Sequence, residues 1–183
     1  MQKIITLLIL ITCIGCQEAI PRRPLQKRTG SFIKASVKRN KKLLKDQETA
    51  IKAIIETDSL NSYQQSTTGS WYFYKKQIKG DTYTPQTDDI VIFTYNLVNF
   101  DNDTLYSMKD IGIVNHKIDK QELIRGLSDG LKILKENEIA TFLFPSSLAY
   151  GYPGDRDRIG ANVPLKATIH LLKIEKNKSL IVN

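Results

Sequence analysis

The sequence predicts an α+β domain, in which an antiparallel sheet wraps around one short helix, behind an N-terminal helical extension. From Trp71 onward, short segments alternate apolar and polar residues as strands do, and one amphipathic helical segment lies between them. A separate helical pattern precedes all of these strands. With 183 residues, 41% of them hydrophobic, the chain is long enough for one domain with a core and an extension.

The first sixteen residues predict an export signal that ends in a lipid anchor. An apolar run of eleven residues follows Met1–Lys3, and it is too short for a bilayer core, which needs about 20 residues. The run suits a signal-peptide core. It ends in Cys13-Ile14-Gly15-Cys16, which resembles the bacterial lipobox, with Cys13 where leucine is usual. We therefore expect residues 1–16 to be a lipoprotein signal peptide with lipidation at Cys16; the alternative is ordinary secretion with an incidental cysteine.

The positive charge of the chain is concentrated beside this anchor. The formal net charge is +8, and residues 17–45 alone hold ten basic residues and one acidic residue. Residues 17–30, which include Pro21 and Pro24, predict a flexible basic tether. A basic tether beside a lipid predicts contact with anionic phospholipid headgroups; the alternative is a solvated linker that its charge keeps extended. The export signal argues against a nucleic-acid partner, and it predicts a periplasm-facing lipoprotein of a bacterial envelope membrane, the outer rather than the inner.

Residues 31–60 predict a helical extension, because apolar residues recur there at intervals of three to four. Asp46 is placed to cap a second helix that ends near Ile55. The polar segment Ser59–Ser70 predicts a loop. Two roles stay open for the extension: it pairs two chains, or it holds the domain away from the bilayer.

The domain itself is predicted over residues 71–177. Its expected strands are Trp71–Tyr74, Asp89–Val98, Thr104–Ser107, Glu138–Phe144 and Ala167–Ile174. The amphipathic pattern from Gln121 to Leu134 predicts the short helix, which Gly126 and Gly130 shorten or tighten.

The sequence contains no pattern that predicts a metal site or a catalytic nucleophile. His116 and His170 form no pair at metal-ligand spacing, and we expect both to be exposed strand residues. With Cys13 and Cys16 assigned to the N-terminus, the domain has no thiol, disulfide or cysteine metal site. No nucleophile elbow or phosphate-binding glycine loop is present. No cofactor is predicted.

Three segments and one strand together resemble the FKBP family of peptidyl-prolyl isomerases. The segments read KQELIRGLSDGL, FPSSLAYG and NVPLKAT, at Lys120–Leu131, Phe144–Gly151 and Asn162–Thr168. They resemble the family patterns K-x-Q-V-I-x-G-W-x-E-G, I-P-x-x-x-A-Y-G and I-P-x-x-A-T-L, and Asp89–Val98 resembles the family strand V-x-V-x-Y-x-G. The resemblance begins near residue 88. A lipid-anchored domain of this kind behind a basic helical stretch is similar to the gliding-motility-associated (GldI-like) lipoproteins of Bacteroidetes.

The resemblance implies a site for proline-containing polypeptides. Tyr95, Ile124 and Tyr150 match the catalytic positions: a tyrosine on the pocket wall, a backbone N–H that meets the substrate carbonyl, and a hydroxyl that bonds the substrate. The implied substrate-binding positions are Leu105, Tyr106, Leu123, Leu127, Val163 and Leu171.

Four of these positions depart from the family pattern. Leu127, Leu105 and Leu171 stand where Trp, Phe and Phe are usual, and Tyr106 stands where Asp is usual. The segment Gly151–Asn162 is also a few residues longer than the family loop. Leucine keeps a pocket apolar but gives it less rigid walls than aromatic rings do. Two functions therefore stay open: a prolyl isomerase for exported proteins with lowered or more selective activity, and a binding or chaperone scaffold with little turnover.

Overall fold

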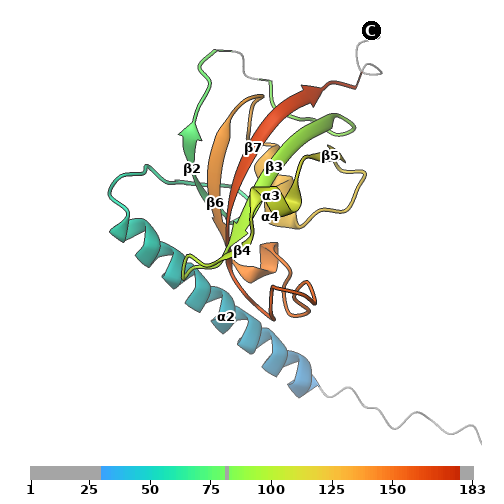
Figure 1. Ribbon diagram of the computed structural model, residues 1–183. Helices are drawn as coiled ribbons and strands as arrows, with labels where there is room; N and C mark the ends of the chain where they lie inside the picture. The colour runs from blue at the N-terminus through green and yellow to red at the C-terminus, as the bar shows by residue number, and fades with distance from the viewer. Residues whose placement is uncertain (1–29, 81–82, 178–183) are drawn as a thin grey trace, which may run out of the picture. The chain divides into compact units, whose positions relative to one another are not determined.

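A computed structural model describes residues 30–80 and 83–177 (Figure 1). The signal peptide, Cys16 and all but the last residue of the predicted tether lie outside the described residues. The chain divides into two compact units, Met1–Val37 and Lys38–Asn183, and the boundary falls inside helix α2 (Gly30–Thr57). The first unit is described only as the N-terminal turns of α2. Everything below concerns the second unit.

The second unit is built on a seven-stranded antiparallel sheet. Along the sheet the strand order is β1-β2-β6-β7-β3-β4, and β5 pairs with β3 (Figure 1). The strands are β1 (Gln64–Gln65), β2 (Trp71–Lys76), β3 (Ile90–Val98), β4 (Thr104–Tyr106), β5 (Val114–Lys117), β6 (Ile139–Phe144) and β7 (Leu165–Glu175). The short helices are α3 (Met108–Ile111), α4 (Arg125–Leu131) and the 3-10 turn η2 (Ser146–Leu148). The α+β class and the antiparallel sheet are as the sequence predicts.

Alternation along the strands separates two faces of the sheet. On β3, Val91, Phe93, Tyr95 and Leu97 point to the inner face, as their spacing predicts, and all four are buried. Leu127 and Leu131 of α4 pack into the same core. Gly126 lets α4 approach the sheet, because an added Cβ there would lie 2.9 Å from ring atoms of Phe144.

A second, smaller core lies on the outer face of the sheet, beneath α2. Ile51 of α2, Trp71 of β2 and Leu143 of β6 are buried together, and Ile54, Ile55, Tyr63 and Phe100 pack against them. The sheet is therefore covered by α4 on one face and partly by α2 on the other. The part of the predicted extension that begins at Lys38 is thus packed onto the domain.

Three local predictions need correction. Asp46 caps no second helix, because α2 runs without a break from Gly30 to Thr57 and Asp46 lies exposed in its middle. The predicted loop Ser59–Ser70 contains the short strand β1. The short helix spans Arg125–Leu131 rather than Gln121–Leu134. Ile124 precedes it with φ −58° and ψ 140°, and the tighter turn Ile133 N–H to Gly130 O ends it.

His116 is buried, which corrects the expectation of an exposed strand residue. It lies on β5 opposite Val91, is 3% exposed, and packs its ring edge against Phe93 with centroids 6.5 Å apart. Its Nε2 has no hydrogen-bond partner among the described residues. Burial lowers the pKa of the His116 imidazole below the usual 6.5, and the nearby Asp119 carboxylate opposes this only in part.

We therefore expect acid to destabilise the domain through His116. The unfolded chain takes up a proton as the pH falls below 6.5, whereas the folded chain resists it, so stability falls with decreasing pH. The slope from one such group is at most about 1.4 kcal/mol per pH unit. Urea unfolding at pH 7.5 and 5.0 measures the dependence, and His116→Phe should flatten it. Equal slopes for His116→Phe and the unaltered protein would contradict this assignment.

Candidate functional site

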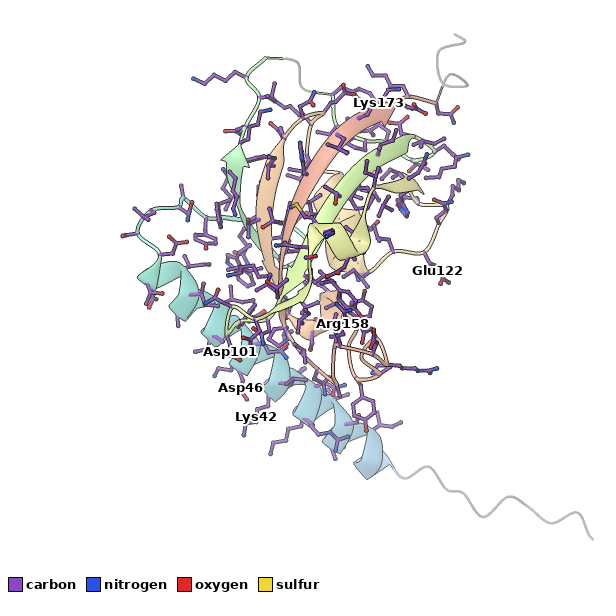
Figure 2. The ribbon with its side chains drawn as sticks, in the orientation of Figure 1. Lys42, Asp46, Asp101, Glu122, Arg158 and Lys173 are labelled. Carbon is purple, nitrogen blue, oxygen red and sulfur yellow. The ribbon has the colours of Figure 1, made fainter. Side chains whose placement is uncertain are left out.

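Four of the predicted site residues line one cavity of about 530 Å³ on the α4 side of the sheet. Tyr95 comes from the middle of β3, Leu123 and Ile124 from the segment that leads into α4, and Tyr150 from the loop after η2. Gln121 and Glu122 complete the lining. Figure 2 shows Glu122 in the segment between β5 and α4, from which its side chain projects outward. All three positions assigned to catalysis thus lie around one cavity.

Tyr95 forms a firm wall because it is paired into the sheet and stacked on a neighbouring ring. It pairs with Ile169 of β7, and its ring stacks on Phe93 with centroids 5.6 Å apart. Only 8% of Tyr95 is exposed. Burial raises the pKa of Tyr95 to about 12, and the nearby Tyr150 adds to the shift. The pKa of Tyr150 is raised in the same way, by burial first and by the negative Asp155 second. Both hydroxyls are therefore protonated hydrogen-bond donors at neutral pH.

Ile124 offers a backbone donor at the end of the same cavity. Its carbonyl accepts from Leu127 N and Ser128 N, each at 3.0 Å, which starts α4. Its own N–H precedes the helix and has no partner within the described residues. An unpaired N–H beside an apolar surface is an unsatisfied donor that a ligand carbonyl can satisfy.

The five remaining predicted residues lie outside the lining of this cavity. Leu105, Tyr106 and Val163 are half-buried at the edge of the main core. Leu127 and Leu171 are 0% exposed, so in this structure they pack the core and present no surface to a ligand. These two leucines therefore pack in the core beneath the lining of the cavity.

Tyr106 has an acidic partner from an unexpected part of the chain. Its hydroxyl donates to Asp155 Oδ2 at 2.6 Å and to Asp157 Oδ2 at 3.2 Å, both in the long loop after Tyr150. The bond to Asp155 and then burial raise the pKa of Tyr106 to about 12. Burial alone would raise the pKa of Asp155, but hydrogen bonds from Tyr106, Asp157 N and Ile159 N hold it below its usual value. Asp155 therefore stays ionised at neutral pH and ties the long loop to β4.

Arg158 strengthens the same attachment (Figure 2). Its Nη1 donates to Leu105 O at 3.0 Å, and its guanidinium lies 4.8 Å from the centre of the Tyr106 ring. It also approaches Asp110 Oδ2 at 3.6 Å. The longer segment Gly151–Asn162 thus brings a carboxylate and a guanidinium to β4.

Gln47 of α2 holds the other side of the loop that carries Tyr150. Its Oε1 accepts from Ser146 N and from Ser146 Oγ, each at 3.0 Å, and its Nε2 donates to Asn162 O at 2.8 Å. One buried amide therefore joins both ends of the segment 146–162. Sequence reasoning missed Gln121 and Glu122 in the lining, and Gln47, Asp155 and Arg158 beside it. Gln47 is the one buried position in a run of exposed polar residues, and no pattern marks it.

In residues 30–80 and 83–177, no three His, Cys, Asp or Glu side chains lie close enough to hold a metal ion. None of the helices in these ranges combines the length and apolar character needed to cross a membrane.

Comparison with known proteins agrees with the fold. Residues 81–172 match the family model of the FKBP-type peptidyl-prolyl cis-trans isomerases. The chain belongs to this family.

One curated relative carries the name of the same class of enzyme. It is 37% identical, over 109 residues, to a probable FKBP-type peptidyl-prolyl cis-trans isomerase, FkpA, of Neisseria meningitidis serogroup B. The match covers 59% of this chain and 39% of that protein, so the chain spans well under half of that relative.

Two solved structures share the fold at 20% identity. A peptidyl-prolyl cis-trans isomerase of Pseudomonas syringae pv. tomato matches with a TM-score of 0.59, over 74% of this chain and 96% of that one. FkpA of Escherichia coli matches with a TM-score of 0.58, over 96% of this chain and 82% of that one.

Proposed function

We propose that this protein catalyses the cis-trans isomerisation of X–Pro bonds in exported polypeptides. The observation that carries the proposal is the cavity itself, where Tyr95, the unpaired N–H of Ile124 and Tyr150 lie around one partly apolar space. Membership of the family supports the same reaction class.

The isomerisation requires a binding site and does not require acid–base groups. Rotation about a peptide bond has a barrier of roughly 18–20 kcal/mol, because amide resonance must be broken. Water solvates the polar, planar amide better than the twisted one, which has lost part of its charge separation. A cavity that excludes water and grips the proline ring therefore favours the twisted form. Each tenfold acceleration requires about 1.36 kcal/mol of such preference.

Four residues of the cavity divide this work. Tyr95 and Leu123 supply apolar walls for the proline ring, while the Ile124 N–H and the Tyr150 hydroxyl donate to substrate carbonyls. Because the pKa values of both tyrosines are raised, neither hydroxyl loses its proton near neutral pH. The substrate is thereby held at two carbonyls while the bond between them rotates.

Replacing Tyr150 by phenylalanine should lower kcat/KM about tenfold, since one hydrogen bond to the substrate contributes about 0.5–1.5 kcal/mol. A protease-coupled or NMR exchange assay on a short X–Pro peptide measures this. Tyr152→Phe is the matched control, because Tyr152 is 79% exposed two residues further along the same loop. Equal losses in the two variants would remove Tyr150 from the mechanism.

The scaffold function has one observation in its favour. Leu127 and Leu171 stand at positions that are aromatic in the family pattern, and both are fully buried. The cavity therefore has no aromatic ring at its floor. A site of this kind holds proline less firmly, so binding without useful turnover is the second candidate. Turnover by the unaltered protein no faster than in buffer, with binding of the peptide retained, would decide for the scaffold.

We further propose that the protein is a lipoprotein of the outer membrane, facing the periplasm, with Cys16 as the lipidated residue and a role in gliding motility. The apolar run before Cys16 and the basic tether support this placement. Within α2, the basic residues from Lys38 to Lys45 are exposed, and Figure 2 shows Lys42 among them. Mass spectrometry of the mature protein should find a diacylglyceryl group on an N-terminal Cys16, and Cys16→Ser should release the protein from membranes. An unmodified mature N-terminus at another residue would contradict the anchor.

A further inference from the structure

A second cavity of about 530 Å³ lies on the outer face of the sheet, away from the isomerase cavity. Its floor is a row of residues paired in register across four strands, which are Phe73 of β2, Thr141 of β6, Thr168 of β7 and Asn96 of β3. The end of α2 and Tyr63 form one wall. Helix α2 covers only part of this sheet face, and the uncovered part is the groove.

Two lysines lie on opposite sides of this row. Lys75 is two residues beyond Phe73 on β2, while Lys166 of β7 pairs with Leu143, two residues to the other side of the row. At about 3.3 Å per residue and 4.8 Å per strand, their Cα atoms are roughly 16 Å apart. Neither lysine forms an ion pair among the described residues.

The polar side chains of the groove keep unused hydrogen-bond donors. The hydroxyls of Thr141 and Thr168 bond each other at 2.8 Å, which uses one of their two hydrogens. Asn96 Oδ1 already accepts from Thr168 N at 2.8 Å, so the amide of Asn96 is left with its donor end. Lys166 Nζ bonds Asn102 Oδ1 and retains two further hydrogens.

The one carboxylate at the groove is already satisfied by its neighbours. Asp58 accepts from Asn61, from Tyr63 Oη at 2.9 Å and from Leu60 N at 3.2 Å. In the described part of the chain, Asp58 therefore forms no ion pair with either lysine. A ligand that brings acceptors and negative charge would complete the groove, and Phe73 and Tyr63, whose rings meet edge to face at 4.9 Å, offer it apolar surface.

We propose that this groove binds an extended acidic segment of polypeptide, with a carboxylate at each lysine and an apolar side chain between them. A strand advances about 3.3 Å per residue and its side chains alternate between faces, so two acidic residues four positions apart lie on one face and span most of these roughly 16 Å. Backbone carbonyls of the same segment accept from the hydroxyl and amide donors of the row. The site lies on the opposite face of the sheet from Tyr95, so one chain segment is held there while another occupies the isomerase cavity.

The test uses a fluorescein-labelled peptide of sequence Gly-Glu-Ser-Phe-Ser-Glu-Gly, which has no proline, and the same peptide with glutamine for both glutamates. Fluorescence anisotropy with the full chain should show binding of the first peptide and at least tenfold weaker binding of the second. Lys75→Gln and Lys166→Gln should each weaken binding about three- to fivefold, the range of a partly exposed charge pair. Lys76→Gln is the matched control, because Lys76 is the next residue of β2, exposed and outside the groove.

Three results would overturn the proposal: equal binding of the two peptides, equal effects of Lys75→Gln and Lys76→Gln, or loss of binding in Tyr150→Phe, which would put the peptide in the isomerase cavity. The proposal does not depend on turnover, because the assay reads binding alone. In Lys75→Gln, Lys166→Gln and Lys76→Gln, activity on a short X–Pro peptide should stay unchanged, so failure of the groove and failure of the isomerase are separable.

Discussion

Replacing Gly126 by alanine should destabilise the domain by about 1–3 kcal/mol and disturb the isomerase cavity. An added Cβ would lie 2.9 Å from two ring atoms of Phe144 and 3.0 Å from the backbone oxygen of Leu148. Real Cβ contacts are longer, so α4 must move away from β6, and overpacking of this kind typically costs 1–3 kcal/mol. Helix propensity alone favours alanine over glycine by about 1 kcal/mol. A measured loss of stability would therefore come from the close contact, because helix propensity alone predicts a gain.

The same shift reaches the site, because Ile124 immediately precedes α4 and lines the cavity. Thermal or urea unfolding measures the stability, and the peptide isomerisation assay measures the site. Gly160→Ala is the matched control: its Cβ would meet only Val163 Cγ2, at 3.9 Å, an ordinary contact on an exposed loop. That variant should stay within about 0.5 kcal/mol of the unaltered protein. If Gly126→Ala is as stable as Gly160→Ala, the approach of α4 to β6 is looser than the structure indicates.

The sheet was predictable because its inner face repeats every second residue. Val91, Phe93, Tyr95 and Leu97 alternate with half-exposed neighbours on β3, and burial of one face fixes this register. The helix limits were less predictable, because an apolar pattern from Leu123 to Leu134 continues through turns that bury residues without helical geometry. Leu134 is fully buried although it lies beyond the end of α4.

The site was predictable where one motif supplies each residue and unpredictable where distant segments meet. Tyr95, Ile124 and Tyr150 each stand in a recognisable segment, and the fold brings them to one cavity. Asp155 and Gln47 act through contacts 49 and 99 residues away along the chain. Spacing within a sequence carries no information about such pairs. The hydrogen bond from Tyr106 to Asp155 of the long loop is likewise a contact that only the three-dimensional arrangement reveals.

Replacing Gln47 by methionine should cost about 2–4 kcal/mol of stability and lower isomerase activity. Methionine keeps the volume but not the hydrogen bonds, so Ser146 N loses its acceptor and Asn162 O loses its donor. A buried polar group left without a partner costs about 1–3 kcal/mol, and Gln47 is only 7% exposed. Urea unfolding of this variant measures the loss of stability, and the peptide isomerisation assay measures the loss of activity.

The effect on activity follows from the position of Ser146 in the loop. Its carbonyl accepts from Gly151 N at 2.9 Å and from Ala149 N at 3.0 Å, the residues on either side of Tyr150. Loosening Ser146 therefore loosens the backbone that aims the Tyr150 hydroxyl. Lys52→Met is the matched control, since it places the same side chain at an exposed position of α2 and should change neither reading. A helix that served only as a spacer would tolerate both substitutions equally. Unequal responses would instead make the C-terminal half of α2 a structural part of the isomerase site.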